Sequence, residues 1–324
     1  MARAVPSSPE AEAPSASSAS IWAALAVIYV VWGTTYLAIR VANQTLPPLL
    51  AASVRFLVAG VILYAWSVRR GDRAGDRPGP QQWRAAAIVG VLLLFGGNGG
   101  VVWAERTIPS GIAALLIALV PLWVALIDGA VLRHPVSPLT AIGIVIGFGG
   151  AALLLLGGGG TGRVEPFGML LVVGASLSWA SGALYSRTAP LPRRPLVGAG
   201  MEMIAGGIAL GIAGILAGEL ADLRPEQFSL ASISSLAYLI VFGSFVAFTC
   251  FVWLLRVART SLVATYAYVN PVVAVFLGWL ILGEQVTLRT VVAGMVIVAA
   301  VALIISAGGT GRGDERSVVV GRTR

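Results

Sequence analysis

Charged residues are scarce in this chain. Only 11% of its 324 residues are charged, 57% are hydrophobic, and the mean hydropathy is +0.89. Soluble domains carry about 25% charged residues. A water-soluble fold of this size could not cover its surface with so few charges. The scarcity therefore excludes an ordinary soluble domain and indicates a membrane protein.

Lysine is absent, and cysteine and histidine occur once each, as Cys250 and His134. All 22 basic residues are therefore arginine, which fits a GC-rich bacterial genome. A single cysteine excludes a disulfide within the chain, and one histidine makes no metal site. The pI near 10.5 would suit nucleic-acid binding, but arginine gathered in cytoplasmic loops explains it better. We expect no metal, no cofactor and no nucleic-acid partner.

Long apolar runs make up most of the chain. Each has roughly twenty residues, the length that crosses about 30 Å of hydrocarbon. The breaks between the runs carry proline, glycine or arginine, as helix ends do. The sequence therefore predicts ten transmembrane helices, at residues 21–40, 49–68, 85–105, 110–132, 138–156, 167–187, 196–217, 232–255, 261–282 and 287–306.

Arginine is distributed unevenly between the two sets of loops. With ten spans both tails lie on one side, and that side gathers most of the arginines. Its richest stretch has arginine at positions 69, 70, 73, 77 and 84. Because cytoplasmic loops are enriched in arginine, we expect a multi-pass protein of the bacterial inner membrane with both termini in the cytoplasm.

The two halves of the chain resemble each other. Trp103 and Arg106 recur 150 positions later as Trp253 and Arg256, and Pro121 recurs as Pro271. Nearer the start of each half the offset is 147, and it pairs Trp32 with Trp179, Arg40 with Arg187, Pro48 with Pro195 and Arg55 with Glu202. Each half holds five spans, and an odd number inverts the second copy. Inverted repeats are an architecture of secondary transporters.

The predicted fold is thus an all-α polytopic membrane protein of two inverted five-helix repeats. The expected division is a disordered cytoplasmic tail (1–20), a first repeat (21–156), an extracytoplasmic linker (157–166), a second repeat (167–306) and a cytoplasmic tail (307–324). The first tail contains acidic residues and no apolar core, so it is no signal peptide.

An ordered set of short motifs also carries a family likeness. The motifs are Trp32-Gly33-Thr34-Thr35-Tyr36, Pro47-Pro48, Arg55-Phe56, Gly97-Asn98-Gly99, Ala104-Glu105, Pro109-Ser110-Gly111, Val120-Pro121, Ser178-Trp179-Ala180, Glu202-Met203, Ala267-Tyr268-Val269-Asn270-Pro271 and Gly283-Glu284. In these the chain resembles the EamA family of the drug/metabolite transporter superfamily. The first repeat departs from it, with Arg133-His134 opposite Gly283-Glu284.

The resemblance implies two five-helix repeats around a central cavity, with the fifth and tenth spans at the periphery. It also implies transport of amino acids or other metabolites, usually outward. It implies no particular substrate.

Two of the charged side chains inside predicted spans occupy matching positions of the two repeats. Arg55 and Glu202 each lie roughly 10 Å from opposite membrane surfaces, at 1.5 Å per residue of helix. We expect Arg55 to bind an anionic part of the solute, and Glu202 to bind an amine or carry a coupling proton. The alternatives are a snorkelling or structural arginine and a structural glutamate. Their different depths argue against a direct salt bridge.

Further cavity candidates are polar or aromatic residues in the spans, namely Trp32, Tyr36, Asn98, Trp179, Tyr266 and Asn270. Packing or lipid contact is the alternative for each aromatic residue, and helix packing is the alternative for the glycines around Asn98. Pro121 and Pro271 predict helix kinks near mid-membrane, where freed carbonyls would face the cavity. We expect Glu105 and Glu284, near the outer ends of spans, to be solvated.

Other functional classes lack support in the sequence. A membrane-embedded enzyme would need a motif such as H-E-x-x-H or G-x-S-x-G, and neither occurs. A channel filter is not recognisable, although a channel or scaffold without active transport stays an alternative. We therefore expect a secondary transporter, not an enzyme, that exports small metabolites or amino acids by alternating access. Proton coupling is expected because no P-loop is present. The predicted partners are the lipid bilayer and a small solute, with a homodimer left open.

Overall fold

The computed structural model describes residues 17–70, 78–130, 136–156, 165–221, 223–258 and 260–320, all helices, turns or irregular segments. The Arg133-His134 pair and most of the predicted first tail and linker lie outside these residues. The elements are α1 (Ser18–Ala42), α2 (Pro48–Arg69), α3 (Pro80–Gly90), η1 (Val91–Gly99), α4 (Gly100–Ala104), α5 (Ser110–Ile117), α6 (Val120–Ala130), α7 (Pro138–Leu155), α8 (Pro166–Ser186), α9 (Pro195–Leu216), η2 (Pro225–Gln227), α10 (Leu230–Tyr238), η3 (Leu239–Val246), α11 (Ala247–Val257), α12 (Thr260–Val263), α13 (Tyr266–Leu282) and α14 (Leu288–Val320).

Proline and serine begin most of these helices. Proline is the first residue of α2, α3, α7, α8 and α9. An N–H group at this position has no acceptor within the helix, so its absence in proline costs no hydrogen bond. The hydroxyls of Ser17, Ser137 and Ser229 accept main-chain N–H groups at the starts of α1, α7 and α10. These local signals explain why the helix boundaries follow the breaks in the sequence.

The helices reproduce the ten predicted spans. Nine runs in the described residues are long and apolar enough to cross a membrane, and α13 is a tenth apolar helix of 17 residues. The third span combines α3, η1 and α4, and the eighth combines α10, η3 and α11. The prediction of an all-helical polytopic protein is confirmed.

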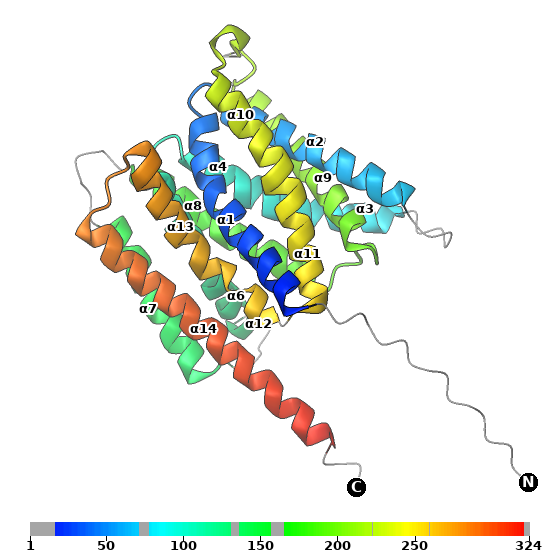
Figure 1. Cartoon of the computed structure of the whole chain (residues 1–324), viewed down its shortest axis with the longest axis vertical. Helices are drawn as coiled ribbons and strands as arrows, with labels where there is room; N and C mark the ends of the chain where they lie inside the picture. Colours follow the sequence, from blue (N-terminus) through cyan, green and yellow to red (C-terminus); the bar gives the residue numbers. More distant parts are fainter. Residues whose placement is uncertain are drawn as a thin grey trace, which may run out of the picture.

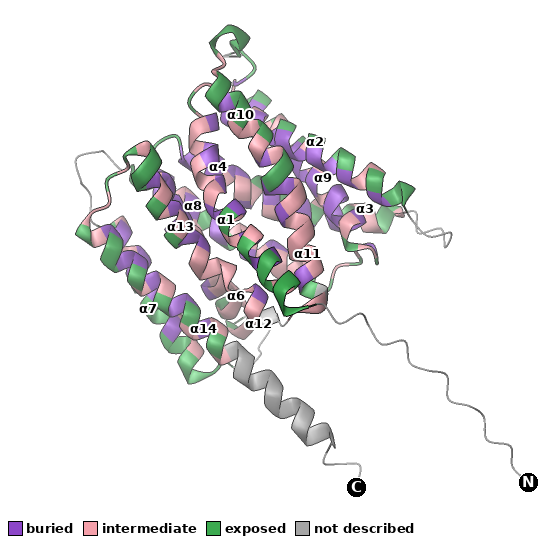
Figure 2. Cartoon of the chain, in the orientation of Figure 1, coloured by how far each residue is buried: buried purple, intermediate pink, exposed green. Residues whose placement is uncertain are grey.

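The helices pack in pairs that follow the two repeats. The second spans, α2 and α9, form the most extensive contact, and the fifth spans, α7 and α14, lie side by side at one edge (Figure 1). The first span of one repeat packs on the third of the other, as α1 on α11 and α8 on η1. Figure 2 shows exposed residues along α7 and α14, as the peripheral position of these helices requires.

Glycines bring α2 and α9 together. A Cβ on Gly207 of α9 would lie 3.0 Å from the main-chain nitrogen of Leu57, and one on Gly60 of α2 would lie 2.9 Å from that of Ile204. These glycines and their neighbours are matched at the offset of 147. Ser53 adds a hydroxyl that donates to the Gly207 carbonyl at 2.7 Å. Small residues of this kind allow close backbone approach between membrane helices.

The third span of each repeat contains a π-helical stretch, which the sequence analysis did not predict. The stretches are η1 and η3, and the offset of 147 aligns Phe95-Gly96 in one with Phe242-Gly243 in the other. π-helical turns are rare and occur mainly at functional sites. Because the π-helical stretch occurs at matching positions in both halves, it belongs to the five-helix repeat itself.

The two mid-span prolines lie in different surroundings. In the fourth span the helix is interrupted at residues 118–119, and Pro121 occupies the first turn of α6. In the ninth span the interruption comes earlier, at residues 264–265, and Pro271 lies inside the uninterrupted α13. The two prolines are therefore equivalent in sequence but not in local structure.

Two carboxylates each bind the N-terminus of a distant helix. Glu219 accepts the main-chain N–H groups of Leu49 and Leu50 at 3.1 and 2.9 Å, at the start of α2. Glu284 accepts those of Ser110 and Gly111 at 2.7 and 3.1 Å, at the start of α5. Each glutamate follows a glycine with positive φ that ends a helix. A carboxylate there satisfies orphan N–H groups and complements the helix dipole.

The α2–α9 contact predicts a specific loss of stability. Gly207→Ala should lower the free energy of unfolding by about 1–3 kcal/mol, because the added methyl meets main-chain atoms of α2. The matched control is Gly174→Ala in α8, whose methyl would meet nothing within 4 Å. Thermal unfolding in detergent measures both. Equal melting temperatures for the two variants would contradict the role given to this contact.

The carboxylate cap of α2 can be tested in the same way. Glu219→Ala should cost about 2 kcal/mol of stability, because two N–H groups lose a charged acceptor. Glu226→Ala, which removes an exposed glutamate of η2, is the control for loss of charge. Native-state hydrogen exchange at the start of α2 should rise in the first variant alone. Unchanged exchange there would mean that the cap does not hold this helix end.

Candidate functional site

Arg55 is buried in the middle of α2. Its side chain is 5% exposed, and its Nε donates a hydrogen bond to the Ser244 hydroxyl of η3 at 2.9 Å. Its Nη1 is buried and has no hydrogen-bond partner among the described residues. A buried guanidinium N–H without an acceptor is costly, and such groups in membrane helices mark sites for ligands.

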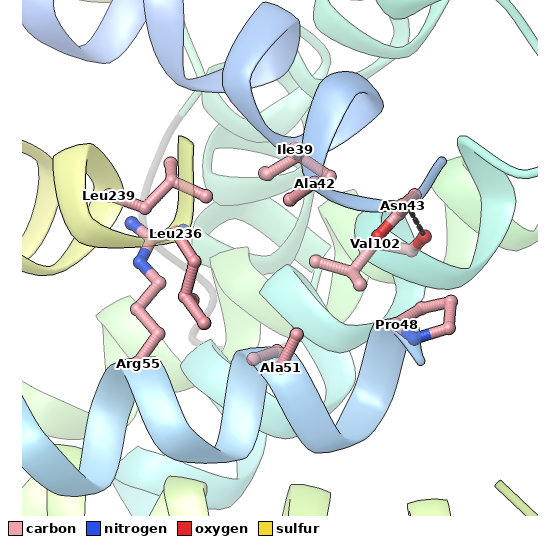
Figure 3. Close-up of a pocket in the computed structure, with 10 residues that line it drawn as sticks. Ile39, Ala42, Asn43, Pro48, Ala51, Arg55, Val102, Leu236 and Leu239 are labelled. Atoms are coloured by element: carbon pink, nitrogen blue, oxygen red, sulfur yellow. Dashed lines mark hydrogen bonds between the residues drawn. The ribbon is translucent and has the colours of Figure 1, made fainter. Parts of the chain in front are cut away.

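A narrow pocket leads to Arg55. Its cavity volume is about 10 Å³, room for about one water molecule. Figure 3 shows the Arg55 side chain extending from α2 towards Leu236 and Leu239, while Asn43 and Pro48 lie at the other end. Asn43 is held by a hydrogen bond from its Nδ2 to the Val102 carbonyl at 2.8 Å. The pocket therefore runs from the end of α1 and the start of α2 towards the guanidinium.

Trp32 and Arg55 meet at the same glycine. The Trp32 Nε1 donates to the Gly243 carbonyl at 3.2 Å, and Arg55 Nη2 lies 3.2 Å from where a Gly243 Cβ would be. Trp32 also contacts Tyr266 edge-on, with ring centroids 5.1 Å apart, and both contact Phe251. The structure thus brings predicted residues Trp32, Tyr266 and Arg55 into one region, with the two aromatic rings largely packed on each other.

Glu202 occupies the equivalent position in the second repeat. It lies on α9, half-buried, where its main-chain carbonyl faces Gly90 of α3. In the described part of the chain no hydrogen bond or ion pair of its carboxylate is recorded, and none joins it to Arg55. The repeat therefore places a cation and an acid at matching positions without pairing them.

The two candidate asparagines have unpaired acceptors. The Oδ1 atoms of Asn98 in η1 and Asn270 in α13 are buried without a hydrogen-bond partner among the described residues. The main-chain carbonyl of Asn270 faces Gly33 of α1. Unpaired acceptors in these helices are suited to accept a bond from a bound solute.

The remaining candidates lie elsewhere in the fold. Trp179 of α8 rests on Gly97, where a Cβ would come within 2.7 Å of its ring. Gly96, Gly99 and Gly100 are filled in the same way by neighbouring helices, which favours the packing interpretation of this glycine cluster. Tyr36 packs against the core around α5 and interacts electrostatically with Glu105.

The expectation that Glu105 and Glu284 are solvated is wrong. Glu105, which directly follows α4, is 0% exposed, and α4 itself packs against α8 and α2. Glu284 is half-buried and binds the start of α5. The hydropathy of the sequence shows where a span ends, but it does not show which other helices bury the residues at that end.

Ser244 and Gly243 are site residues that sequence reasoning missed. They lie in η3, and the offset of 147 aligns them with Gly96 and Gly97 of η1. This alignment of small residues within two apolar runs is the feature of the sequence that could have identified them as site residues. No group of three or more His, Cys, Asp or Glu side chains in the described ranges is placed to hold a metal ion.

Comparison with known proteins identifies the family. The model of the EamA-like transporter family matches residues 17–156 and again 166–306. Over 285 residues the chain is 40% identical to the uncharacterized inner membrane transporter YedA of Escherichia coli K12, covering 88% of this chain and 90% of the relative.

More distant relatives span similar lengths. Protein PecM of Dickeya dadantii is 28% identical over 288 residues, covering 85% of this chain and 88% of that protein. A solved crystal structure superposes with a TM-score of 0.61 at 21% identity, covering 89% of this chain and 98% of the other, which shows a shared fold. With two family matches that coincide with the two five-span repeats, the chain belongs to the EamA-like transporter family.

Proposed function

We propose that the protein is a secondary transporter that exports amino acids or similar small metabolites across the bacterial inner membrane. The observation that carries the proposal is the buried Arg55, which lines a narrow pocket within a two-repeat membrane fold and whose Nη1 has no partner among the described residues. Membership of the EamA-like family and the likeness to the inner membrane transporter YedA support it. Proton coupling is proposed because the sequence has no nucleotide-binding P-loop.

Arg55 is proposed to bind the carboxylate of the solute. Its Nε is already fixed by Ser244, so the planar guanidinium is oriented before a ligand arrives. Arginine binds carboxylates through parallel N–H donors, and the free Nη1 is such a donor. The low dielectric around a 5% exposed side chain strengthens this attraction.

Glu202 is proposed to bind the amine of the solute or to carry the coupling proton. It lies at the position that matches Arg55 and has no recorded partner in the described part of the chain. A solute with both an amine and a carboxylate could use the two residues in turn as the repeats move. This division of labour favours amino acids over uncharged metabolites.

Alternating access is proposed to occur by rocking of the two repeats. The matched π-helical stretches η1 and η3 contact the helices that bear Trp179 and Trp32. The peripheral pair α7 and α14 stays outside this region (Figure 1). The pocket at Arg55 opens where α1 ends and α2 begins, which the arginine bias assigns to the extracytoplasmic side. Both termini are then cytoplasmic.

Solute efflux tests the proposed function. Cells that express the protein and are loaded with amino acids and metabolites should accumulate at least one compound outside, relative to vector controls. Glu202→Gln should abolish that export at unchanged membrane levels, and Glu226→Gln in the exposed η2 should not. Export that survives Glu202→Gln would remove Glu202 as the coupling group. Export of no compound would contradict the proposed function.

The role of Arg55 predicts a change in apparent affinity. Arg55→Lys keeps the charge but loses the fixed donor geometry, so the half-saturating concentration of the exported compound should rise about tenfold or more. Arg69→Lys, at the exposed end of the same helix, is the matched control. Concentration-dependent transport by membrane vesicles gives both values. Equal affinities would assign Arg55 a structural role.

A further inference from the structure

Glu105 is a fully buried carboxyl without a partner. It directly follows α4 and is 0% exposed. Neither of its carboxyl oxygens has a hydrogen-bond partner among the described residues. This differs from Glu219 and Glu284, whose carboxylates each accept main-chain N–H groups. An ionised carboxylate without such donors is strongly disfavoured away from water.

Three ionisable groups interact with Glu105, and they differ in sign. Arg40 and Tyr36 lie on α1, and Glu284 lies in the turn after α13; each is near enough to interact electrostatically with Glu105. The negative charge of Glu284 disfavours a second charge at Glu105, and Arg40 favours one. From α2, Arg55 lines the pocket beside Val102 of α4, but its Nε is bonded to Ser244. From α8, the surface packed on Gly100 is Ala175 and the Leu171 carbonyl.

Arg40 does not pair with the Glu105 carboxylate. The Arg40 Nη1 donates instead to the main-chain carbonyl of Glu105. No ion pair between the two side chains is recorded, although the described residues include both. The guanidinium is therefore held close to the carboxyl while it satisfies another acceptor. This is the arrangement expected beside a neutral carboxyl.

Glu105 has no solvent-exposed surface, so a solute cannot reach its carboxyl in this conformation. It lines neither the pocket at Arg55, which Val102 lines, nor the second pocket, which its neighbours Ala104 and Arg106 line. A ligand at this carboxyl must therefore be very small. The proton is the ligand that fits a buried, unpartnered carboxyl between two pockets.

We propose that Glu105 is a proton-binding site, occupied in this conformation and emptied when water gains access to its carboxyl. On release, the O–H bond breaks, the proton passes to water, and the carboxylate left behind takes the Arg40 guanidinium from the main-chain carbonyl. The proton site is distinct from Glu202. Its use in coupling rests on the proposed transport function, but proton binding itself does not.

Infrared difference spectroscopy tests the site on the full chain in lipid nanodiscs, with pH as the only variable. The wild type should show the C=O band of a protonated carboxylic acid at neutral pH, and the band should disappear at alkaline pH. The spectrum of Glu105→Gln should lack the part of this C=O band that comes from Glu105, and the spectrum of Glu226→Gln should retain it. A neutral-pH spectrum of Glu105→Gln identical to that of the wild type would overturn the proposal.

A second variant keeps the test decisive if Glu105→Gln does not fold. Arg40→Gln removes the charge that favours ionised Glu105, so the pH at which the band disappears should move upwards. An unchanged midpoint would overturn the proposal. Because neither spectrum needs a solute, failure of the efflux assay would contradict the transport function alone, whereas an unaltered band would contradict the proton site alone.

Discussion

A helix that crosses hydrocarbon must satisfy its main-chain polar groups within the protein, and this constraint governs the whole arrangement. Proline starts five helices because its missing N–H removes one orphan donor. Elsewhere the carboxylates of Glu219 and Glu284 bind the first N–H groups of α2 and α5 from distant parts of the chain. These bonds tie the helix starts of the first repeat to the helix ends of the second.

The same constraint gives the unpaired polar atoms their significance. Most polar groups of the bundle interior are bonded, as Ser53 is to Gly207 and Ser244 is to Arg55. Against that background, Arg55 Nη1, the Oδ1 atoms of Asn98 and Asn270, and the Glu105 carboxyl stand out. A symmetric scaffold thus carries asymmetric chemistry, with a cation at position 55 and an acid at the matching position 202.

The sequence was sufficient for the scaffold because hydrophobic length and proline positions are local signals. The ten spans came from such signals, whereas the pairing of Arg55 with Glu202 came from the internal repeat and the family likeness came from the ordered motifs. The burial of Glu105, the cap by Glu219 and the π-helical stretches were not predicted, since each depends on contacts with a distant helix. Pro121 and Pro271 show the same limit, because the helix interruption comes just before Pro121 in one repeat, at residues 118–119, and earlier in the other, at residues 264–265, which leaves Pro271 inside a helix.

The most direct test of the account is transport by the purified protein in liposomes with an imposed pH gradient. At least one amino acid should accumulate above its external concentration when the liposome interior is acidic, and a protonophore should abolish the accumulation. A solute level that is the same with and without the gradient would contradict proton-coupled secondary transport and would favour a passive pathway.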